Sequence, residues 1–344
     1  MLITGLGTFW GGRLAQVLEA DPDVEVIIGL DRVEPNVKLE RTEYVRSDEN
    51  YSILNRIVQA TKVDTIVHTF LVVDSTQMAG RLLHEINVIG TMNLFAAASA
   101  PGSTVRDVVV KSSALVYGAS PQDPVWCREE FRRKSTPHTR VERSLLEVEG
   151  YVRDFAVDNP HVMVSLLRFS NVIGKDIVTP LTKALQLPLV PSVLGFDPRF
   201  QFVHEDDVLR AILFVLDKEA PGIFNVAGDG LLPWSEVAKI CGKRTVPLPF
   251  VGVNLATAPL RRIGVDLPPE LIDLLRYGRG IDNRRLQDAG FRYEYTSAGA
   301  VQAFCEALRL RQTVGKDVAY HYDDEVETFF RHSHAVVRDK PDGG

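Results

Sequence analysis

The N-terminal segment of the chain has the pattern of an apolar strand, a glycine-rich turn, a helix and a second apolar strand. Residues 1–4 are mostly apolar up to the turn, and residues 13–20 carry apolar side chains at helical spacing. A proline-containing turn at 21–23 ends this helix, and residues 24–30 form a nearly continuous apolar run that leads to Asp31. Such a run is typical of a strand that is buried on both faces. The segment therefore predicts a βαβ unit.

The same alternation continues to residue 167. Further strands are expected at 43–47, 63–68, 107–113 and 162–167, and helices at 50–61, 78–98 and about 138–157. Strands that alternate with helices predict an α/β fold with a parallel, doubly wound sheet. Ligands of such sheets bind at the carboxyl ends of the strands. The residues at those ends include Gly7, Asp31, His68 and Ser113.

Composition narrows the class of protein. The net charge of the 344 residues is −6, which argues against a nucleic-acid partner, because such a partner requires a basic surface. Hydrophobic residues at 45% and charged residues at 24% are ordinary for a globular protein. Since no apolar run approaches the length of a membrane span and no signal-peptide pattern is present, we expect a cytoplasmic protein without a membrane partner.

Metal binding is not expected. Cys127, Cys241 and Cys305 are scattered without CxxC spacing, which indicates neither a disulfide framework nor a zinc site. The segment 204–207 (His-Glu-Asp-Asp) carries metal-binding residue types, but it lies at a predicted helix start, where acidic side chains suit the helix dipole.

The glycine-rich turn predicts a dinucleotide cofactor. Gly5, Gly7 and Gly11 lie between the first strand and the first helix, and Asp31 follows about twenty residues later, as in a dinucleotide-binding βαβ unit. The glycines let the backbone approach a pyrophosphate, and the helix N-terminus offers N–H groups to it. Asp31 would bind the ribose hydroxyls and repel a 2′-phosphate, which favours NAD over NADP; adjacent Arg32 opposes this preference.

Several short blocks, in order from residue 1 to about 305, resemble the extended short-chain dehydrogenases/reductases, the NAD-dependent epimerase/dehydratase family of nucleotide-sugar enzymes. The blocks include Thr4-Gly5 with Gly11, Asp31, Asp48, Val67-His68, 87–94, 112–118, 167–174, 202–208, 224–228 and 282–286. The resemblance implies a Rossmann-type sheet and adds Asp48 and His68 to the candidate NAD-binding residues. It also implies a domain at 1–174, a smaller substrate-binding domain at 175–311 with some chain returning to the sheet, and a polar tail at 312–344.

The catalytic residues of the family are matched only in part. Ser113 stands where the family keeps a Ser or Thr that hydrogen-bonds the reacting oxygen. The family's Tyr-x-x-x-Lys pair should follow on the next helix, and its two positions hold His138 and Glu142. In the family, the tyrosine removes a proton with help from the lysine, which also binds the nicotinamide ribose. Here that chemistry is lost or rewired.

Two interpretations of His138 and Glu142 remain. Histidine can act as a general base near neutral pH, and a carboxylate four residues away on one helix face could orient it. Alternatively, the pair is what remains of an abandoned catalytic helix, which is the simpler history. The first interpretation predicts an oxidoreductase or epimerase that uses Ser113 and His138, and the second predicts a non-catalytic NAD-binding regulator or complex subunit.

Other departures concern both ligands. Thr8 replaces the middle glycine of the family's turn, and the bulky pair 70–71 replaces Ala-Ala against the cofactor. Asn171 matches an asparagine that touches the substrate diphosphate in the family. The family's diphosphate-binding arginine is Phe200 here, with Arg199 one residue away. A small-molecule substrate such as a nucleotide sugar is therefore supported by fewer residues than NAD is.

A homodimer is expected through two helices. The segment 86–97 is apolar nearly all round, and in the family this helix and the one that follows Ser113 form a four-helix bundle across a two-fold axis. Charged residues on the second helix oppose the pairing. They are Glu142, Arg143, Glu147, Glu149, Arg153 and Asp154.

Overall fold

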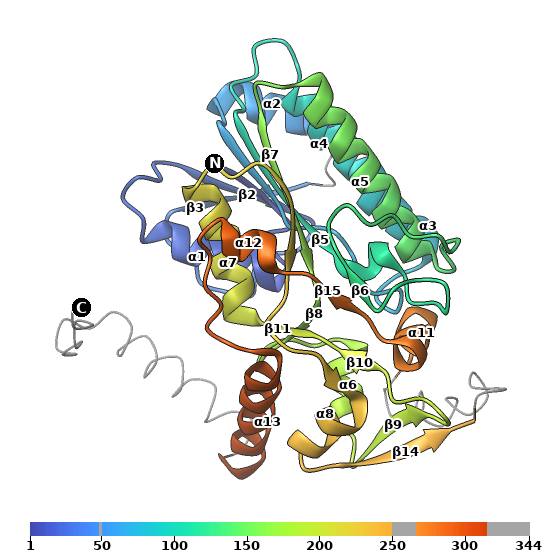
Figure 1. Ribbon diagram of the computed structural model, residues 1–344. Helices are drawn as coiled ribbons and strands as arrows, with labels where there is room; N and C mark the ends of the chain where they lie inside the picture. Colours follow the sequence, from blue (N-terminus) through green and yellow to red (C-terminus); the bar gives the residue numbers. More distant parts are fainter. Residues whose placement is uncertain (48–49, 250–265, 315–344) are drawn as a thin grey trace, which may run out of the picture.

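The computed structural model describes residues 1–47, 50–249 and 266–314 (Figure 1). Its centre is a sheet of seven parallel strands in the order β12-β7-β5-β4-β1-β2-β3. The strands are β1 (Leu2–Thr4), β2 (Ile27–Asp31), β3 (Thr42–Arg46), β4 (Thr65–His68), β5 (Asp107–Ser113), β7 (Met163–Phe169) and β12 (Gly222–Val226). The predicted parallel, doubly wound sheet is confirmed. The order runs outward in both directions from β1, so the carboxyl ends of β1 and β4 meet at a crevice.

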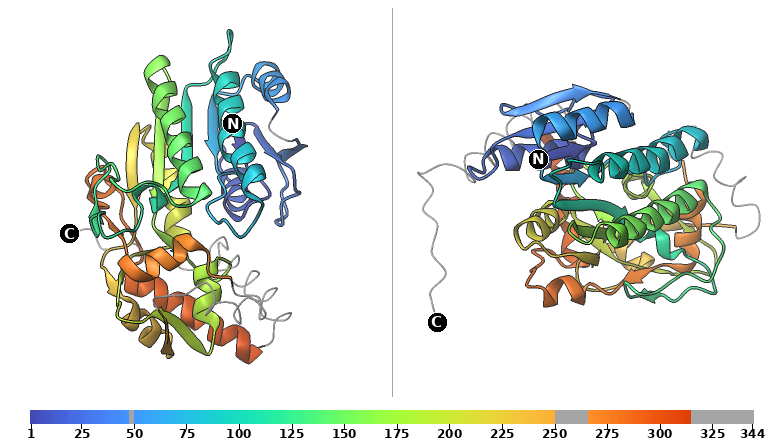
Figure 2. Two further views of the ribbon diagram at one scale, coloured as in Figure 1. Left: turned by 90° about the vertical axis from the view of Figure 1, so that its right-hand side faces the viewer. Right: turned by 90° about the horizontal axis from the view of Figure 1, so that it is seen from above.

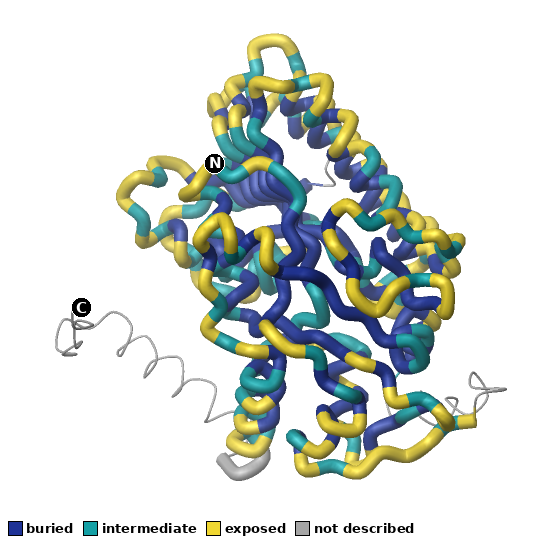
Figure 3. The backbone as a smooth tube through the Cα atoms, in the orientation of Figure 1, coloured by how far each residue is buried: buried dark blue, intermediate teal, exposed yellow. Residues whose placement is uncertain are grey.

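Helices cover both faces of this sheet (Figures 1 and 2). On one face lie α1 (Phe9–Glu19) and α7 (Glu205–Asp217), whose apolar side chains pack with Ile3, Val109 and Leu167 of the strands. On the other face lie α2 (Tyr51–Thr61), the continuous α3 (Gly80–His84), η1 (Glu85–Ile89) and α4 (Gly90–Ala98), and α5 (Arg140–Asp158). The central strands are buried on both sides, as their continuous apolar runs predicted (Figure 3).

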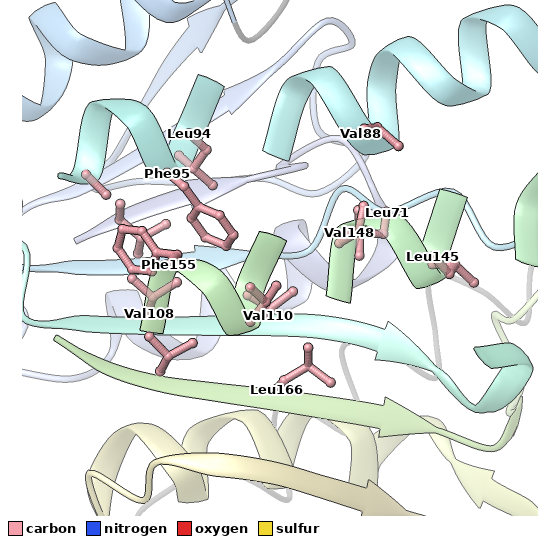
Figure 4. Close-up of a cluster of buried hydrophobic side chains, with 14 of the residues drawn as sticks. Leu71, Val88, Leu94, Phe95, Val108, Val110, Leu145, Val148, Phe155 and Leu166 are labelled. Atoms are coloured by element: carbon pink, nitrogen blue, oxygen red, sulfur yellow. The ribbon is translucent and has the colours of Figure 1, made fainter. Parts of the chain in front are cut away.

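The helices α4 and α5 are held together by apolar packing. The rings of Phe95 and Phe155 stack with centroids 4.6 Å apart, and both pack in the cluster that covers Val108 and Val110 of β5 (Figure 4). This packing fixes the position of α5 along the sheet and, with it, the position of the residues that precede the helix.

The first turn of α5 differs from the sequence prediction. The predicted helix began at 138, but α5 begins at Arg140 and its N-cap is Thr139. The side chain of Thr139 accepts a hydrogen bond from the N–H of Glu142, while the Glu142 carboxylate accepts one from the N–H of Thr139, which is a capping box. His138 therefore lies before the helix, and His138 and Glu142 do not share a helix face.

A second core lies beyond the carboxyl ends of the strands, below the sheet in the left view of Figure 2. It is built largely from residues 173–305. Three short strand pairs contribute to it: β8 (Asn171–Ile173) with β11 (Phe202–His204), β9 (Leu189–Val193) with β14 (Arg244–Leu248), and β10 (Arg199–Phe200) with β13 (Leu232–Pro233). A fourth pair, β6 (Trp126–Cys127) with β15 (Gly280–Ile281), packs its buried side chains into the core of the central sheet. The helices of this core are α6 (Pro180–Gln186), α8 (Trp234–Ile240), α11 (Pro269–Tyr277) and α13 (Ser297–Val314), whereas α12 (Arg284–Asp288) packs against β12 of the central sheet. The smaller domain at 175–311 stays a prediction; within this range, α7 and β12 pack with the central sheet.

One covalent link was not foreseen. Cys241 at the end of α8 and Cys305 in α13 form a disulfide, with Cα atoms 5.3 Å apart. The two cysteines are 64 residues apart in the sequence, so only the packing of α8 against α13 brings them together. The third cysteine, Cys127, is a buried free thiol. In the described ranges, no helix is long and apolar enough to cross a membrane.

Candidate functional site

A cavity of about 400 Å³ opens at the carboxyl ends of the central strands. Its wall on the sheet side comes from the first turn of α1 and from residues that end or follow β4, β5 and β7. Its opposite wall comes from residues 176–181 and from α11 in the smaller core. The cavity thus spans the place where the sequence predicted a cofactor and the place where it predicted a substrate.

The glycine-rich turn and Asp31 are directly connected. The N–H of Gly7 donates to Oδ2 of Asp31 at 2.9 Å, and the N–H of Val33 donates to Oδ1 at 3.1 Å. A Cβ on Gly7 would lie 2.5 Å from the carbonyl oxygen of Val33, so a side chain does not fit there. Burial raises the pKa of Asp31, and these hydrogen bonds oppose the rise. Since a carboxylate has about four acceptor positions, Asp31 retains capacity for ribose hydroxyls.

Thr8, which departs from the family pattern, has a structural function. It is the N-cap of α1: its hydroxyl accepts from the N–H of Gly11 at 3.1 Å and donates to the carbonyl of Gly5 at 2.6 Å. In the described structure the next two N–H groups, of Phe9 and Trp10, have no acceptor, as is usual in a first helical turn. Both residues line the cavity, so the positive end of α1 faces it.

The predicted cofactor contact of His68 is not formed by its ring. The side chain is fully buried and bonds to Oγ1 of Thr4 at 2.6 Å and to Oγ1 of Thr91 at 3.0 Å. Burial, with a smaller effect of nearby Lys111, lowers the pKa of His68 to about 4, so the ring is neutral and serves to join β1, β4 and α4. Arg32 is partly exposed after β2, and Asp48 lies outside the described residues.

Ser112 and Ser113 at the end of β5 both line the cavity, but their hydroxyls have different partners. Ser113 lines the cavity, and its hydroxyl accepts from the N–H of Leu115 at 3.2 Å. Ser112 donates to the carboxylate of Glu149 on α5 at 2.8 Å. The same carboxylate forms a buried ion pair with Arg168 at 2.6 Å, and Arg168 also donates to the hydroxyl of Tyr117. This buried network fixes the end of β5 and so the position of Ser113.

The proposed dyad of His138 and Glu142 is not formed. The carboxylate of Glu142 accepts the backbone N–H of His138 at 2.8 Å and pairs with the guanidinium of Arg133 at 3.3 Å. The imidazole of His138 points elsewhere and contacts the carboxylate of Asp273 on α11 at 3.4 Å. The side chain is 58% exposed and does not line the cavity. The dyad fails because α5 begins two residues later than the spacing assumed.

Of the two residues predicted to bind the substrate, Asn171 lines the cavity and Arg199 does not. Asn171 lines the cavity while its amide donates to the carbonyl of Gln201 at 2.9 Å. Arg199 is exposed on β10 and does not line it. Arg279 takes its place: its buried guanidinium lines the cavity and donates to the carbonyl of Gly118 at 3.0 Å. Burial lowers the pKa of Arg279 to about 10.

The acidic side chains at 204–207 form contacts within the protein. Glu205 accepts the N–H of Lys175 at 2.9 Å, and burial together with the nearby charge of Asp176 raises the pKa of Glu205 to about 7. Asp176 lines the cavity and is held by Arg13 of α1 at 3.4 Å and by Arg311 of α13 at 2.7 Å. Among the residues that the structure describes, no cluster of His, Cys, Asp and Glu could hold a metal ion.

Sequence reasoning missed Lys111. This lysine lies on β5 two residues before Ser113, is buried, and lines the cavity. The signal was a single charged residue inside the apolar run of a central strand, which is an expensive place for a charge.

The fold and the site define a class of protein. A doubly wound parallel sheet, a glycine-rich turn that opens α1, and an acid at the end of β2 are the features of a dinucleotide-binding Rossmann-type protein. The profile of the NAD dependent epimerase/dehydratase family matches residues 1–227, and the chain belongs to that family. Its dependence on NAD agrees with the cofactor predicted from the sequence.

Individual relatives agree with this assignment. The chain is 34% identical over 319 residues to the uncharacterized protein Rv0501 of Mycobacterium tuberculosis, covering 90% of this chain and 84% of that protein. It is 33% identical over 123 residues to UDP-glucose 4-epimerase 2 of Oryza sativa subsp. japonica, covering 35% of this chain and 29% of that enzyme. The solved structure of MoeE5 in complex with UDP-glucose and NAD has a TM-score of 0.68 at 19% identity, covering 91% of this chain and 99% of that one, which shows the shared fold.

Proposed function

We propose that the protein binds NAD at the carboxyl ends of β1, β2 and β4, with a small molecule of the nucleotide-sugar class beside it. The N-terminal turn of α1 would hold the cofactor diphosphate, and Asp31 would bind the adenosine ribose. The free N–H groups of Phe9 and Trp10 and the remaining acceptor capacity of Asp31 fit these roles. When bound, NAD supplies a nicotinamide ring that exchanges a hydride.

The substrate class is supported by the opposite wall of the cavity. Arg279 presents a buried guanidinium to the cavity, and Asn171, which follows β7, also lines the cavity. A guanidinium held by burial is suited to a phosphate group, because its planar donors match phosphate oxygens. The MoeE5 structure, whose title names UDP-glucose and NAD, shares the fold, which is compatible with the same class of ligand here.

We further propose that the family's tyrosine and lysine chemistry has been lost rather than rewired. The observation that carries this is the capping box of α5: Glu142 is committed to backbone N–H groups and to Arg133. His138 is not among the residues that line the cavity, whereas Ser113 is. This arrangement supports a non-catalytic NAD-dependent regulator or complex subunit.

The test combines binding with turnover. Calorimetric titration should show binding of NAD, weaker binding of NADP, and binding of UDP-glucose to the NAD complex. Incubation of that complex with UDP-glucose should produce neither UDP-galactose nor a rise in NADH absorbance. Interconversion of the two sugars would contradict the loss of catalysis, and failure to bind either dinucleotide would contradict the proposed cofactor.

One observation keeps an active enzyme as the second candidate. The hydroxyl of Ser113 faces the cavity at the position where the family polarises the reacting oxygen. If turnover is found with another sugar nucleotide or ketone, Ser113→Ala should abolish it, whereas His138→Ala should leave it unchanged.

We also propose a homodimer through α4 and α5. Two of the charges that opposed this pairing, Glu142 and Glu149, are buried inside the subunit and do not lie on the outer face of α5. Ile89 and Met92 are exposed at 41% and 39%, respectively, which gives this surface an apolar patch. An apolar patch with fewer outward charges suits a subunit interface.

A further inference from the structure

Lys111 is a buried ammonium group that faces the cavity. It lies on β5 in register with Leu167 of β7, and its side chain is only 5% exposed. Its Nζ lies 5.8 Å from the centroid of the Trp10 ring, in the first turn of α1. Both Lys111 and Trp10 line the cavity, so the ammonium faces the cavity beside a side chain of the first turn of α1.

Among the residues that the structure describes, no acidic side chain pairs with this charge. Within the described part of the chain, Lys111 forms no hydrogen bond or ion pair with a side chain. Its ammonium group makes a cation–π contact with the ring of Trp10. His68 on β4 is neutral, as shown above. Asp176, which also lines the cavity, is engaged by Arg13 and Arg311. Burial accordingly lowers the pKa of Lys111 to about 8.

The charged groups on the other elements around β5 are also engaged. Arg168 of β7 and Glu149 of α5 pair with each other next to Ser112. On α7, Asp207 pairs with Arg210 and Glu205 accepts backbone N–H groups. Three further ionisable groups line the cavity, namely Asp74, Glu270 and Arg279. Asp74 accepts from the N–H and hydroxyl of Thr76, Glu270 accepts from Ser75, and Arg279 donates to the carbonyl of Gly118.

The first turn of α1 and the ammonium of Lys111 both contribute positive charge to the cavity. The first turn of α1 offers the unpaired N–H groups of Phe9 and Trp10 and the positive end of the helix dipole. Beside it, Lys111 offers a full positive charge without a counterion. A buried charge of this kind is costly unless a ligand pairs with it. The arrangement is therefore suited to an anion.

We propose that Lys111 is a ligand-binding residue that, together with the N-terminal turn of α1, binds the diphosphate of NAD. This inference rests on the proposed NAD binding and assigns to β5 a positive charge that the glycine-rich turn alone does not supply. It also accounts for a lysine in a strand whose other central residues, Val108, Val109 and Val110, are apolar.

The test compares two ligands on three proteins. Dissociation constants of NAD and of ADP-ribose, which keeps the diphosphate but lacks nicotinamide, are measured by calorimetry for the wild type, Lys111→Met and Lys111→Arg. Loss of one charge-assisted contact should weaken both ligands about ten- to a hundredfold in Lys111→Met. Lys111→Arg should recover part of the affinity, because it restores the charge.

The results distinguish a wrong role for Lys111 from a wrong assignment of NAD binding. Equal affinities of the wild type and Lys111→Met for both ligands would overturn the role of Lys111 and leave NAD binding intact. A loss for NAD with ADP-ribose unaffected would also overturn it, since the contact would then be on the nicotinamide side. A wild type that binds neither ligand would overturn the proposed function itself and the inference with it.

Two further measurements guard against misfolding. Without ligand, Lys111→Met should melt at the same temperature as the wild type or higher, because it removes an uncompensated buried charge. The wild-type affinity for ADP-ribose should fall about tenfold between pH 7 and pH 9, since the ammonium with its pKa about 8 loses its proton over that range. An affinity that stays constant with pH would contradict the proposal without any variant.

Discussion

The carboxylate of Glu142 lies 3.3 Å from the guanidinium of Arg133, and both side chains are buried. The same carboxylate caps α5 through the N–H groups of His138 and Thr139. An acidic residue at the family's lysine position therefore stabilises the start of a helix. In this structure the carboxylate of Glu142 is engaged within the subunit.

The capping role of Glu142 predicts a large loss of stability. Glu142→Ala leaves Arg133 buried without its partner and removes the cap, so we expect the free energy of unfolding to fall by about 3 kcal/mol. Denaturant unfolding measures this. The matched control is Glu147→Ala on the same helix, whose carboxylate is 41% exposed and should change stability by less than about 0.5 kcal/mol. Similar effects of the two substitutions would show that Glu142 has no special structural role.

The hydrogen bonds of Asp31 predict cofactor preference. Asp31→Asn keeps an oxygen for the N–H of Gly7 but removes the charge that repels a 2′-phosphate. We expect NAD to bind at least about tenfold more weakly and the preference over NADP to shrink. Calorimetric titration with both dinucleotides measures this, with Asp23→Asn on the exposed turn before β2 as the control. Unchanged NAD affinity in Asp31→Asn would mean that the ribose is bound elsewhere.

The exposed position of His138 predicts a small effect. His138→Ala removes a half-exposed contact with Asp273, so the free energy of unfolding should fall by less than about 1 kcal/mol and NAD affinity should not change. If His138 were a general base, its removal would reduce turnover about a hundredfold to ten-thousandfold. A reduction of that size, on any substrate that is turned over, would restore the histidine as a catalytic residue.

The exposed apolar patch on η1 and α4 predicts the assembly. Ile89→Lys with Met92→Lys should convert a dimer into a monomer, because charged groups would be buried in the interface. Light scattering at micromolar concentration measures the mass. Leu310→Lys on α13, outside the proposed interface and with a side chain that is 59% exposed, should leave the dimer intact. A wild type that is already monomeric would rule out the proposed interface.

Burial of Glu205 predicts a dependence of stability on pH. Its pKa rises from 4.5 to about 7 on folding, so the folded state holds the proton more tightly. The resulting stabilisation is fully present below pH 4.5 and is lost as pH rises through about 7. The loss is on the order of 3 kcal/mol by the conversion of pKa shifts. Glu205→Gln should therefore gain stability relative to the wild type between pH 5 and pH 8, and a constant difference over this range would exclude the titration of Glu205.

Much of the fold could be predicted from local sequence pattern. The apolar runs that become β1, β2, β5 and β7, and the helical spacing of 13–20, depend on residues that are close in the sequence. Parallel connections then leave few arrangements of the sheet, since crossovers have one hand. The family blocks added the cofactor. The class of protein and its cofactor NAD could therefore be predicted from the sequence.

The details of the site were decided by tertiary structure. A shift of two residues at the start of α5 turned an apparent pair of His138 and Glu142 into a cap, because helix ends depend on the packing of the whole helix. The strand-end position of His68 did not reveal that Thr4 and Thr91 enclose its ring. Lys111 was visible as a lysine in an apolar strand, but only the fold placed it beside Trp10 at the N-terminus of α1. Sequence periodicity fixes which face of an element is apolar, whereas the partners of a buried polar group come from residues far away in the chain.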